Sequence, residues 1–176
     1  KALDLEPVGV QCAPENRLQP VPADFDGVDF DGLMVASPAN PTGTMLDRTA
    51  MTGLIEACQA KGATFLSDEI YHGIEYEAKA VSALEVSDDV CVINSFSKYF
   101  SMTGWRVGWL VLPPKQVRQV ERLAQNMFIC ASHAAQIAAL AAMDAQDEMQ
   151  ANRDVYATNR RLMLEGLPKA GFDRIA

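Results

Sequence analysis

Short apolar runs separated by helical patterns recur along the chain. The runs have the length and composition of buried strands, and they cover residues 33–36, 63–67, 90–94 and 107–112, with a further short run at 8–12. Residues 14–32 are rich in Pro and Asp, which predicts a loop. Strands that alternate with helices favour a parallel sheet with helices packed on its faces. The pattern therefore predicts an α/β fold with a mainly parallel sheet flanked by helices.

One predicted helix carries a signal at each end. Asp47 is a typical N-cap residue, and Gly62 suits the turn that follows a helix. Between them the apolar positions follow the 3.6-residue period of a helix: Met51, Leu54, Ile55 and Cys58. The spacing predicts a helix between these two signals.

The C-terminal half of the chain has a helical composition. A helix is predicted from Pro114 to about Asn126, because proline suits the first turn of a helix. Everything after Ser132 is also predicted to be helical, with a break near Asn152 and a stop at Gly166.

The composition is that of a domain with an apolar core. The chain has 176 residues, 49% of them hydrophobic, and this length is ordinary for a single domain. The net charge is −8 and no Lys or Arg cluster forms a basic stripe, so neither nucleic acid nor a membrane surface is an expected partner. The longest apolar stretch, 127–143, is interrupted by Ser132, His133 and Gln136, which predicts a core helix rather than a membrane span.

The four cysteines lie far apart in the sequence: Cys12, Cys58, Cys91 and Cys130. No Cys-x-x-Cys pair with a matching histidine spacing occurs, so neither a disulfide framework nor a metal site is predicted. Reduced thiols are typical of the cytoplasm, which is the expected location of the protein.

Polar residues of unusual type follow three of the predicted strands. Asn40 follows the first strand, Asp68 and Tyr71 follow the second, and Ser95 and Lys98 follow the third. In an open parallel sheet, ligands bind in the crevice beyond the carboxyl ends of the strands. We therefore expect these side chains to converge on one small ligand.

Each of these residues also has an ordinary structural interpretation. Asn40 precedes a proline and suits a turn, Asp68 suits a cap, and a lysine such as Lys98 is usually solvated. Arg106 lies eight residues after Lys98 and suits a surface ion pair. Their joint occurrence at successive strand ends favours instead an amine and an anion-binding group in one site.

Four motifs carry a resemblance to a known family: Ser-Pro-Ala-Asn-Pro-Thr-Gly at 37–43, Ser-Asp-Glu-Ile-Tyr at 67–71, Ser-Phe-Ser-Lys at 95–98 and Thr-Gly-Trp-Arg-Val-Gly at 103–108. The chain resembles the central part of a class I/II pyridoxal-phosphate-dependent aminotransferase of fold type I. The resemblance implies that residues 1–150 belong to an incomplete cofactor-binding large domain. Residues 151–176 would then lead toward a C-terminal small domain that lies outside this chain.

The resemblance implies a catalytic set of Lys98, Asp68 and Tyr71 around pyridoxal 5′-phosphate. Lys98 would form an aldimine with the cofactor and would later move the proton of the substrate Cα. Asp68 would pair with the pyridine nitrogen and keep it protonated, so that the ring acts as an electron sink.

The other contacts that the resemblance implies hold the cofactor in place. Asn40 and Tyr71 would hydrogen-bond its phenolic oxygen, and Ser95 and Arg106 would bind its 5′-phosphate through charge-assisted bonds. No role is assigned to three further polar residues: His72, Ser97 and His133.

The resemblance implies an aminotransferase that moves an amino group between an amino acid and a 2-oxo acid, and a homodimer for the full-length protein. Two alternatives would keep the same cofactor residues: a lyase of the same fold, and a non-catalytic effector-sensing domain of a transcription regulator. The spacing of Ser95 and Lys98 also matches penicillin-binding enzymes, but the Lys-Thr-Gly and Ser-Asp-Asn elements of those enzymes do not occur in the sequence.

Overall fold

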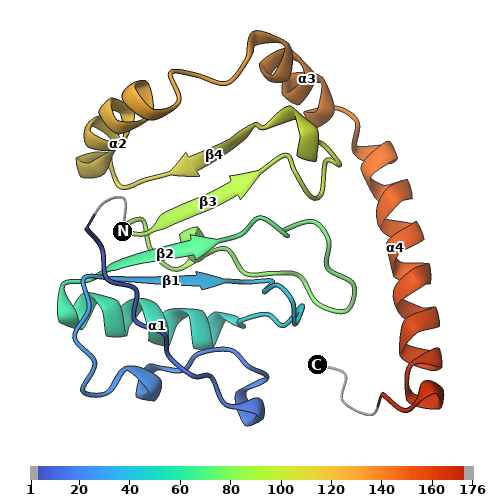
Figure 1. Cartoon of the computed structure of the whole chain (residues 1–176), viewed down its shortest axis with the longest axis horizontal. Coiled ribbons are helices and arrows are strands. Elements are labelled where there is room, and N and C mark those ends of the chain that lie inside the picture. Colours follow the sequence, from blue (N-terminus) through green and yellow to red (C-terminus); the bar gives the residue numbers. More distant parts are fainter. Residues whose placement is uncertain (1–3, 173–176) are drawn as a thin grey trace.

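A four-stranded sheet forms the centre of the fold (Figure 1). The structure is a computed structural model, and it describes residues 4–172. The strands lie side by side in the order β1 (Gly32–Ala36), β2 (Thr64–Asp68), β3 (Cys91–Ser95) and β4 (Gly108–Val111). β1, β2 and β3 are parallel, and β4 is antiparallel to β3. The mainly parallel sheet is confirmed, and each strand begins and ends within one residue of its predicted position.

The connection between β3 and β4 holds no α-helix, which fits the antiparallel direction of β4. A parallel neighbour usually needs a helical crossover, whereas residues 96–107 hold one 3-10 turn, η4 (Thr103–Trp105). Ser95 and Gly108 face each other across the two strands. A Cβ atom at Gly108 would lie 2.7 Å from the Asn94 carbonyl oxygen, so glycine lets the strands approach closely beside Ser95.

The helix α1 (Arg48–Lys61) packs against the sheet with both predicted caps in place. Asp47 Oδ1 accepts a hydrogen bond from the Ala50 N–H at 2.8 Å, and Gly62 ends the helix with a φ of 67°. The predicted apolar positions are buried and join a core with residues of β1, β2 and β3: Val35, Met51, Leu54, Ile55, Cys58, Phe65 and Val92. The predicted helix is confirmed at both ends and on its buried face.

Cys58 lies inside this core and is shielded from water. The residue is 1% exposed, and burial raises the pKa of its thiol to about 11. Burial also raises the pKa of Cys91, and the nearby Asp89 adds to that shift while Lys115 opposes it. All four cysteines are free thiols.

Three helices follow β4: α2 (Pro114–Met127), α3 (His133–Met143) and α4 (Gln146–Gly166). The start of α2 and the stop after α4 were predicted correctly, but the predicted break near Asn152 is wrong. The break lies between α3 and α4, and α4 continues through Asn152. The Asn152 side chain donates to Ser101 Oγ at 3.5 Å, so it does not compete for the backbone of its own helix.

The predicted strand at 8–12 is also wrong. These residues have no regular secondary structure, and Val8 is 61% exposed. Pro7 and Pro14 flank the run and lack the N–H groups that strand pairing uses. The predicted loop that follows is confirmed, with two short 3-10 turns, η1 (Pro14–Asn16) and η2 (Pro22–Phe25).

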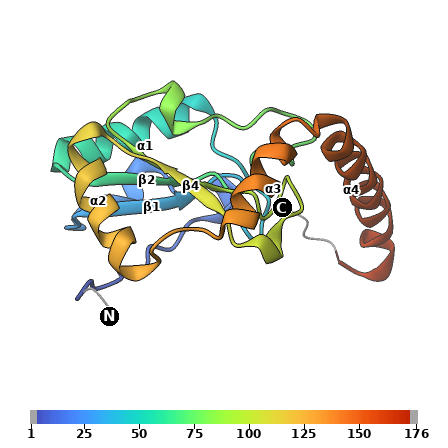
Figure 2. The ribbon, with the colours of Figure 1, turned by 90° about the horizontal axis from the view of Figure 1, so that it is seen from above.

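The helix α4 stands apart from the sheet, beyond the carboxyl ends of β1 and β2 (Figure 2). The loops that follow β1, β2 and β3 lie at this same edge of the sheet. Within residues 4–172, no helix is long and apolar enough to cross a membrane.

Candidate active site

Asn40 lies in a tight loop directly after β1. The Ala39 N–H donates to the Thr44 carbonyl oxygen at 3.0 Å, and the Gly43 N–H donates to the Ala39 carbonyl oxygen at 2.7 Å. Gly43 has a φ of 70°, a backbone conformation that favours glycine. The loop therefore closes on itself and leaves the Asn40 side chain exposed.

Tyr71 lies in a turn directly after β2. The Glu69 N–H donates to the Ile93 carbonyl oxygen at 2.9 Å, which continues the pairing of β2 with β3 by one residue. Asp68 Oδ1 accepts a hydrogen bond from the Ile70 N–H at 3.1 Å, and this bond shapes the turn. Asp68 thus performs the capping role that was its ordinary structural interpretation, and its other carboxylate oxygen is available to a ligand.

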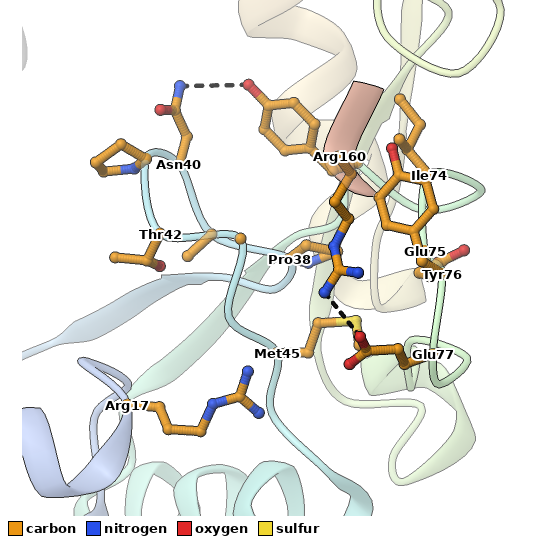
Figure 3. A pocket seen from close by; sticks show the side chains of 14 residues that line it. Arg17, Pro38, Asn40, Thr42, Met45, Ile74, Glu75, Tyr76, Glu77 and Arg160 are labelled. Carbon is orange, nitrogen blue, oxygen red and sulfur yellow. Dashed lines mark hydrogen bonds and ion pairs between the residues drawn. The ribbon is translucent and has the colours of Figure 1, made fainter. Parts of the chain in front are cut away.

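The structure brings three of the predicted site residues together. Asn40 Nδ2 donates to the Tyr71 hydroxyl at 3.3 Å (Figure 3). Lys98 Nζ lies 5.4 Å from the centre of the Tyr71 ring, within the range of a cation–π contact. An amine, a phenol and an amide from three different loops therefore meet at the carboxyl edge of the sheet.

Asp68 lies at the same edge but makes no direct bond to that group. It pairs with Ala36 of β1 and Ile93 of β3, so it ends the central strand of the three parallel ones. In the described part of the chain, no hydrogen bond joins its carboxylate to Asn40 or Lys98. Its position suits contact with a ligand that lies across the ends of the strands.

Ser95 ends β3 and Arg106 lies in the connection to β4, where serine and threonine hydroxyl groups form local hydrogen bonds. The Ser97 N–H donates to Ser95 Oγ at 2.9 Å, and the two hydroxyl oxygens are 2.8 Å apart. Thr103 Oγ1 donates to the Ser97 carbonyl oxygen at 2.6 Å, and Arg106 Nη1 donates to the Thr103 carbonyl oxygen at 2.9 Å. Ser97, which had no predicted role, is therefore a buried support for Ser95, and the Ser-x-Ser spacing is a local signal for such a contact.

A cavity of about 470 Å³ opens beside Asn40 and Tyr71. Its wall is formed by the loop after β1 and by the segment after Tyr71, and Arg17 and Arg160 reach it from distant parts of the chain (Figure 3). Lys98 and Asp68 do not line it. The cavity therefore adjoins the cluster of Asn40, Tyr71 and Lys98 without containing its amine.

Tyr76 lines this cavity, and no role in a site is predicted for it from the sequence. The guanidinium carbons of Arg153 and Arg160 lie 5.9 and 5.4 Å from the centre of its ring. Burial raises the pKa of Tyr76, and the two positive charges oppose that shift. No local pattern signals these contacts, because they join α4 to a segment about 78 positions earlier in the chain.

The candidate residues carry more positive charge than negative charge. Lys98 and Arg106 are cations that only donate hydrogen bonds, Asp68 is a carboxylate, and Asn40, Tyr71 and Ser95 can both donate and accept. Such a set suits an anionic ligand that also carries one protonated group. Among the residues that the structure describes, no group of three or more His, Cys, Asp or Glu side chains is arranged to hold a metal ion.

The family model of aminotransferase class I and II matches residues 15–176. The chain belongs to this family. It is 41% identical to the valine–pyruvate aminotransferase of Mycobacterium tuberculosis, over 99% of this chain and 47% of that protein. It is 38% identical to an aspartate aminotransferase of Sulfurisphaera tokodaii, over 78% of this chain and 35% of that protein.

Solved structures show the same relationship. A crystal structure of a candidate aminotransferase from Silicibacter pomeroyi superposes with a TM-score of 0.95 at 74% identity, covering 98% of this chain and 47% of that one. An aminotransferase from Mycobacterium tuberculosis superposes with a TM-score of 0.90 at 40% identity, covering 95% and 45%. The chain thus spans about half the length of these proteins, and its fold is that of an incomplete fold type I large domain.

Proposed function

We propose that the chain is the cofactor-binding part of an aminotransferase that uses pyridoxal 5′-phosphate and moves an amino group between an amino acid and a 2-oxo acid. The observation that carries the proposal is the meeting of three side chains. Lys98 Nζ lies 5.4 Å from the centre of the Tyr71 ring, and the Tyr71 hydroxyl accepts a hydrogen bond from Asn40. An amine beside two hydrogen-bonding groups suits an aldehyde that neighbours a phenolic oxygen.

The remaining side chains fit the rest of this cofactor. The guanidinium of Arg106 and the hydroxyl of Ser95 suit the 5′-phosphate, because a planar guanidinium forms paired charge-assisted bonds with phosphate oxygens. The carboxylate of Asp68, at the end of the central strand, suits a protonated pyridine nitrogen. Asn40 and Tyr71 would hold the phenolic oxygen and so orient the ring.

The chain's own residues would divide the chemistry among them. When bound, pyridoxal 5′-phosphate supplies a protonated ring that withdraws the electron pair released at the substrate Cα. Asp68 would keep the proton on the ring nitrogen, because a nearby carboxylate favours the charged form. Lys98 Nζ would accept the proton that leaves the substrate Cα and would then pass it on.

An absorbance titration of the full-length protein tests the cofactor assignment. Added pyridoxal 5′-phosphate should produce a visible band in the wild type and in Lys115→Ala, but not in Lys98→Ala. Lys115 is a suitable control because it forms an exposed ion pair with Asp89. A band that persists in Lys98→Ala would contradict the assignment of the amine.

The same preparation tests the reaction. An amino acid added without a 2-oxo acid should convert the bound cofactor to pyridoxamine 5′-phosphate. Release of ammonia would identify a lyase instead, and a spectral change without either product would identify a sensing domain.

We propose that the amino donor is one of the amino acids in the names of the relatives. Those names include valine–pyruvate, aspartate and arginine–pyruvate aminotransferases, at 36–41% identity. The highest of these identities is to the valine–pyruvate aminotransferase, which supports valine and pyruvate as the first pair to test. Rates of the half-reaction with valine, aspartate and arginine would rank the three donors.

We also propose a cytoplasmic homodimer for the full-length protein, with residues 1–150 in the large domain and residues 151–176 leading toward a small domain. The support for a dimer is a set of exposed apolar side chains on α3 and just before it: Phe128, Ile129, Ile137 and Leu140. The free thiols support a cytoplasmic location for the protein. Analytical ultracentrifugation should give twice the mass of one chain.

A further inference from the structure

His72 joins two of the segments that build the candidate site. It follows Tyr71, and its side chain is 20% exposed. Its Nε2 lies 3.0 Å from the Ser37 carbonyl oxygen, which can only accept, so Nε2 carries the hydrogen. The other ring nitrogen, Nδ1, lies 3.5 Å from Glu69 Oε2. The imidazole ring therefore bridges a carboxylate on one side and a backbone carbonyl on the other.

Glu69 is the fixed end of this bridge. The residue is 3% exposed, and its Oε1 accepts hydrogen bonds from Ser67 Oγ at 3.0 Å, Ser82 Oγ at 3.1 Å and the Ala83 N–H at 2.8 Å. A buried carboxylate requires such partners, and three of them hold it in one orientation. Oε2 consequently stays directed toward His72.

Ser37 is the other end of the bridge. It is 1% exposed, its N–H donates to the Asp68 carbonyl oxygen at 3.1 Å, and its Oγ accepts from the Leu46 N–H at 3.0 Å. Ser37 also begins the loop that carries Asn40. A hydrogen bond to its carbonyl oxygen therefore helps to fix the position of the first residue of that loop.

We propose that His72 is a positioning residue, which holds the loop of Asn40 against the turn of Tyr71 so that both side chains face the same ligand. The one direct link between these two side chains is a 3.3 Å bond at an exposed position, and water competes with such a bond. The bridge through His72 is more buried and engages the backbone. The nature of the ligand rests on the proposed function, whereas the link between the two segments does not depend on it.

The experiment compares His72→Ala, His72→Gln and the control His133→Ala in the full-length protein. His133 is a second histidine, exposed at the start of α3. Hydrogen exchange without cofactor would report on the amides of Ala39 and Gly43, which close the Asn40 loop. A fluorescence titration with pyridoxal 5′-phosphate would report on the site.

We expect His72→Ala to speed exchange at Ala39 and Gly43 while the sheet amides stay protected. Its dissociation constant for pyridoxal 5′-phosphate should rise about 5- to 10-fold, the factor that follows from one ordinary hydrogen bond. The amide of His72→Gln can still donate to the Ser37 carbonyl oxygen, so this variant should recover most of the affinity. His133→Ala should match the wild type in both measurements.

Two results would overturn the positioning role and leave the proposed function standing. One is a wild-type dissociation constant and unchanged loop exchange in His72→Ala. The other is a loss of protection throughout the sheet that His72→Gln does not reverse, which would show a general structural role. If even the wild type fails to bind pyridoxal 5′-phosphate, the proposed function is wrong, and the exchange rates at Ala39 and Gly43 still decide whether His72 positions the loop.

Discussion

Arg106 has an uncommon backbone conformation and a guanidinium with hydrogen-bond donors that remain available for a ligand. Its φ is 55°, in the left-handed region that few residues other than glycine adopt. Its Nη1 donates to the Thr103 carbonyl oxygen, whereas a guanidinium has five N–H groups in all. Backbone conformations of this kind cluster at functional sites, and the exposed donors of Arg106 suit the phosphate role that remains a prediction for this residue.

Replacing Arg106 by lysine would test that role. The substitution keeps the charge but removes the planar pair of donors, so we expect the affinity for pyridoxal 5′-phosphate to fall about 10- to 100-fold, from the loss of about 1.5–3 kcal/mol. Arg118→Lys is the matched control, because Arg118 forms an exposed ion pair with Glu121 on α2. Equal dissociation constants for the two variants, measured by equilibrium dialysis, would exclude a phosphate role for Arg106.

The elements were predicted well where local signals define them. The helix α1 has an N-cap at Asp47, a glycine at 62 and an apolar face, and all three are local properties of the sequence. The direction of β4 is not contained in its own apolar run, because such a run is the same in either direction. Residues 8–12 were predicted as a strand, and they do not form one. Their apolar composition favours a strand, but it does not supply a neighbouring strand for pairing.

The contact between β3 and β4 leads to a prediction about glycine. Alanine at position 108 would bring its Cβ to 2.7 Å from the Asn94 carbonyl oxygen and 3.2 Å from Ser95 Cα, so the strands would have to separate. We expect Gly108→Ala to lower the free energy of unfolding by about 1–3 kcal/mol, as overpacking does. Gly104→Ala is the control, because nothing lies within 4 Å of the Cβ position there. Urea denaturation that shows the same stability for both variants would refute this account of the close approach.

At the scale of the whole molecule, α4 contacts the segment of the chain that follows Tyr71. Arg153 Nε on α4 donates to the Glu75 carbonyl oxygen at 2.8 Å, and Arg160 forms an ion pair with Glu77 at 2.8 Å. Together they enclose Tyr76, in the segment that lines the cavity beside Asn40. The helix that stands apart from the sheet is therefore attached at the candidate site.

The stability of the whole molecule should also depend on pH through the Cys58 thiol. Burial raises its pKa from 9.0 to about 11, so the folded state retains a proton that the unfolded state loses above pH 9. The contribution of the thiol is constant below pH 9 and falls by about 2 kcal/mol at pH 10.5. The stability advantage of the wild type over Cys58→Ala should therefore shrink between pH 8 and 10.5. Urea denaturation in the presence of a reductant would measure it, and an unchanged difference would contradict the shift.

The sequence by itself determined the α/β class, the places of the strands, the caps of α1 and the family, because periodicity, capping and short motifs depend on neighbouring residues. Only the tertiary structure decided that β4 is antiparallel, that Asn40 bonds to Tyr71, and that His72 reaches Ser37. These features depend on which distant segments meet, and a meeting of that kind leaves no pattern along the chain.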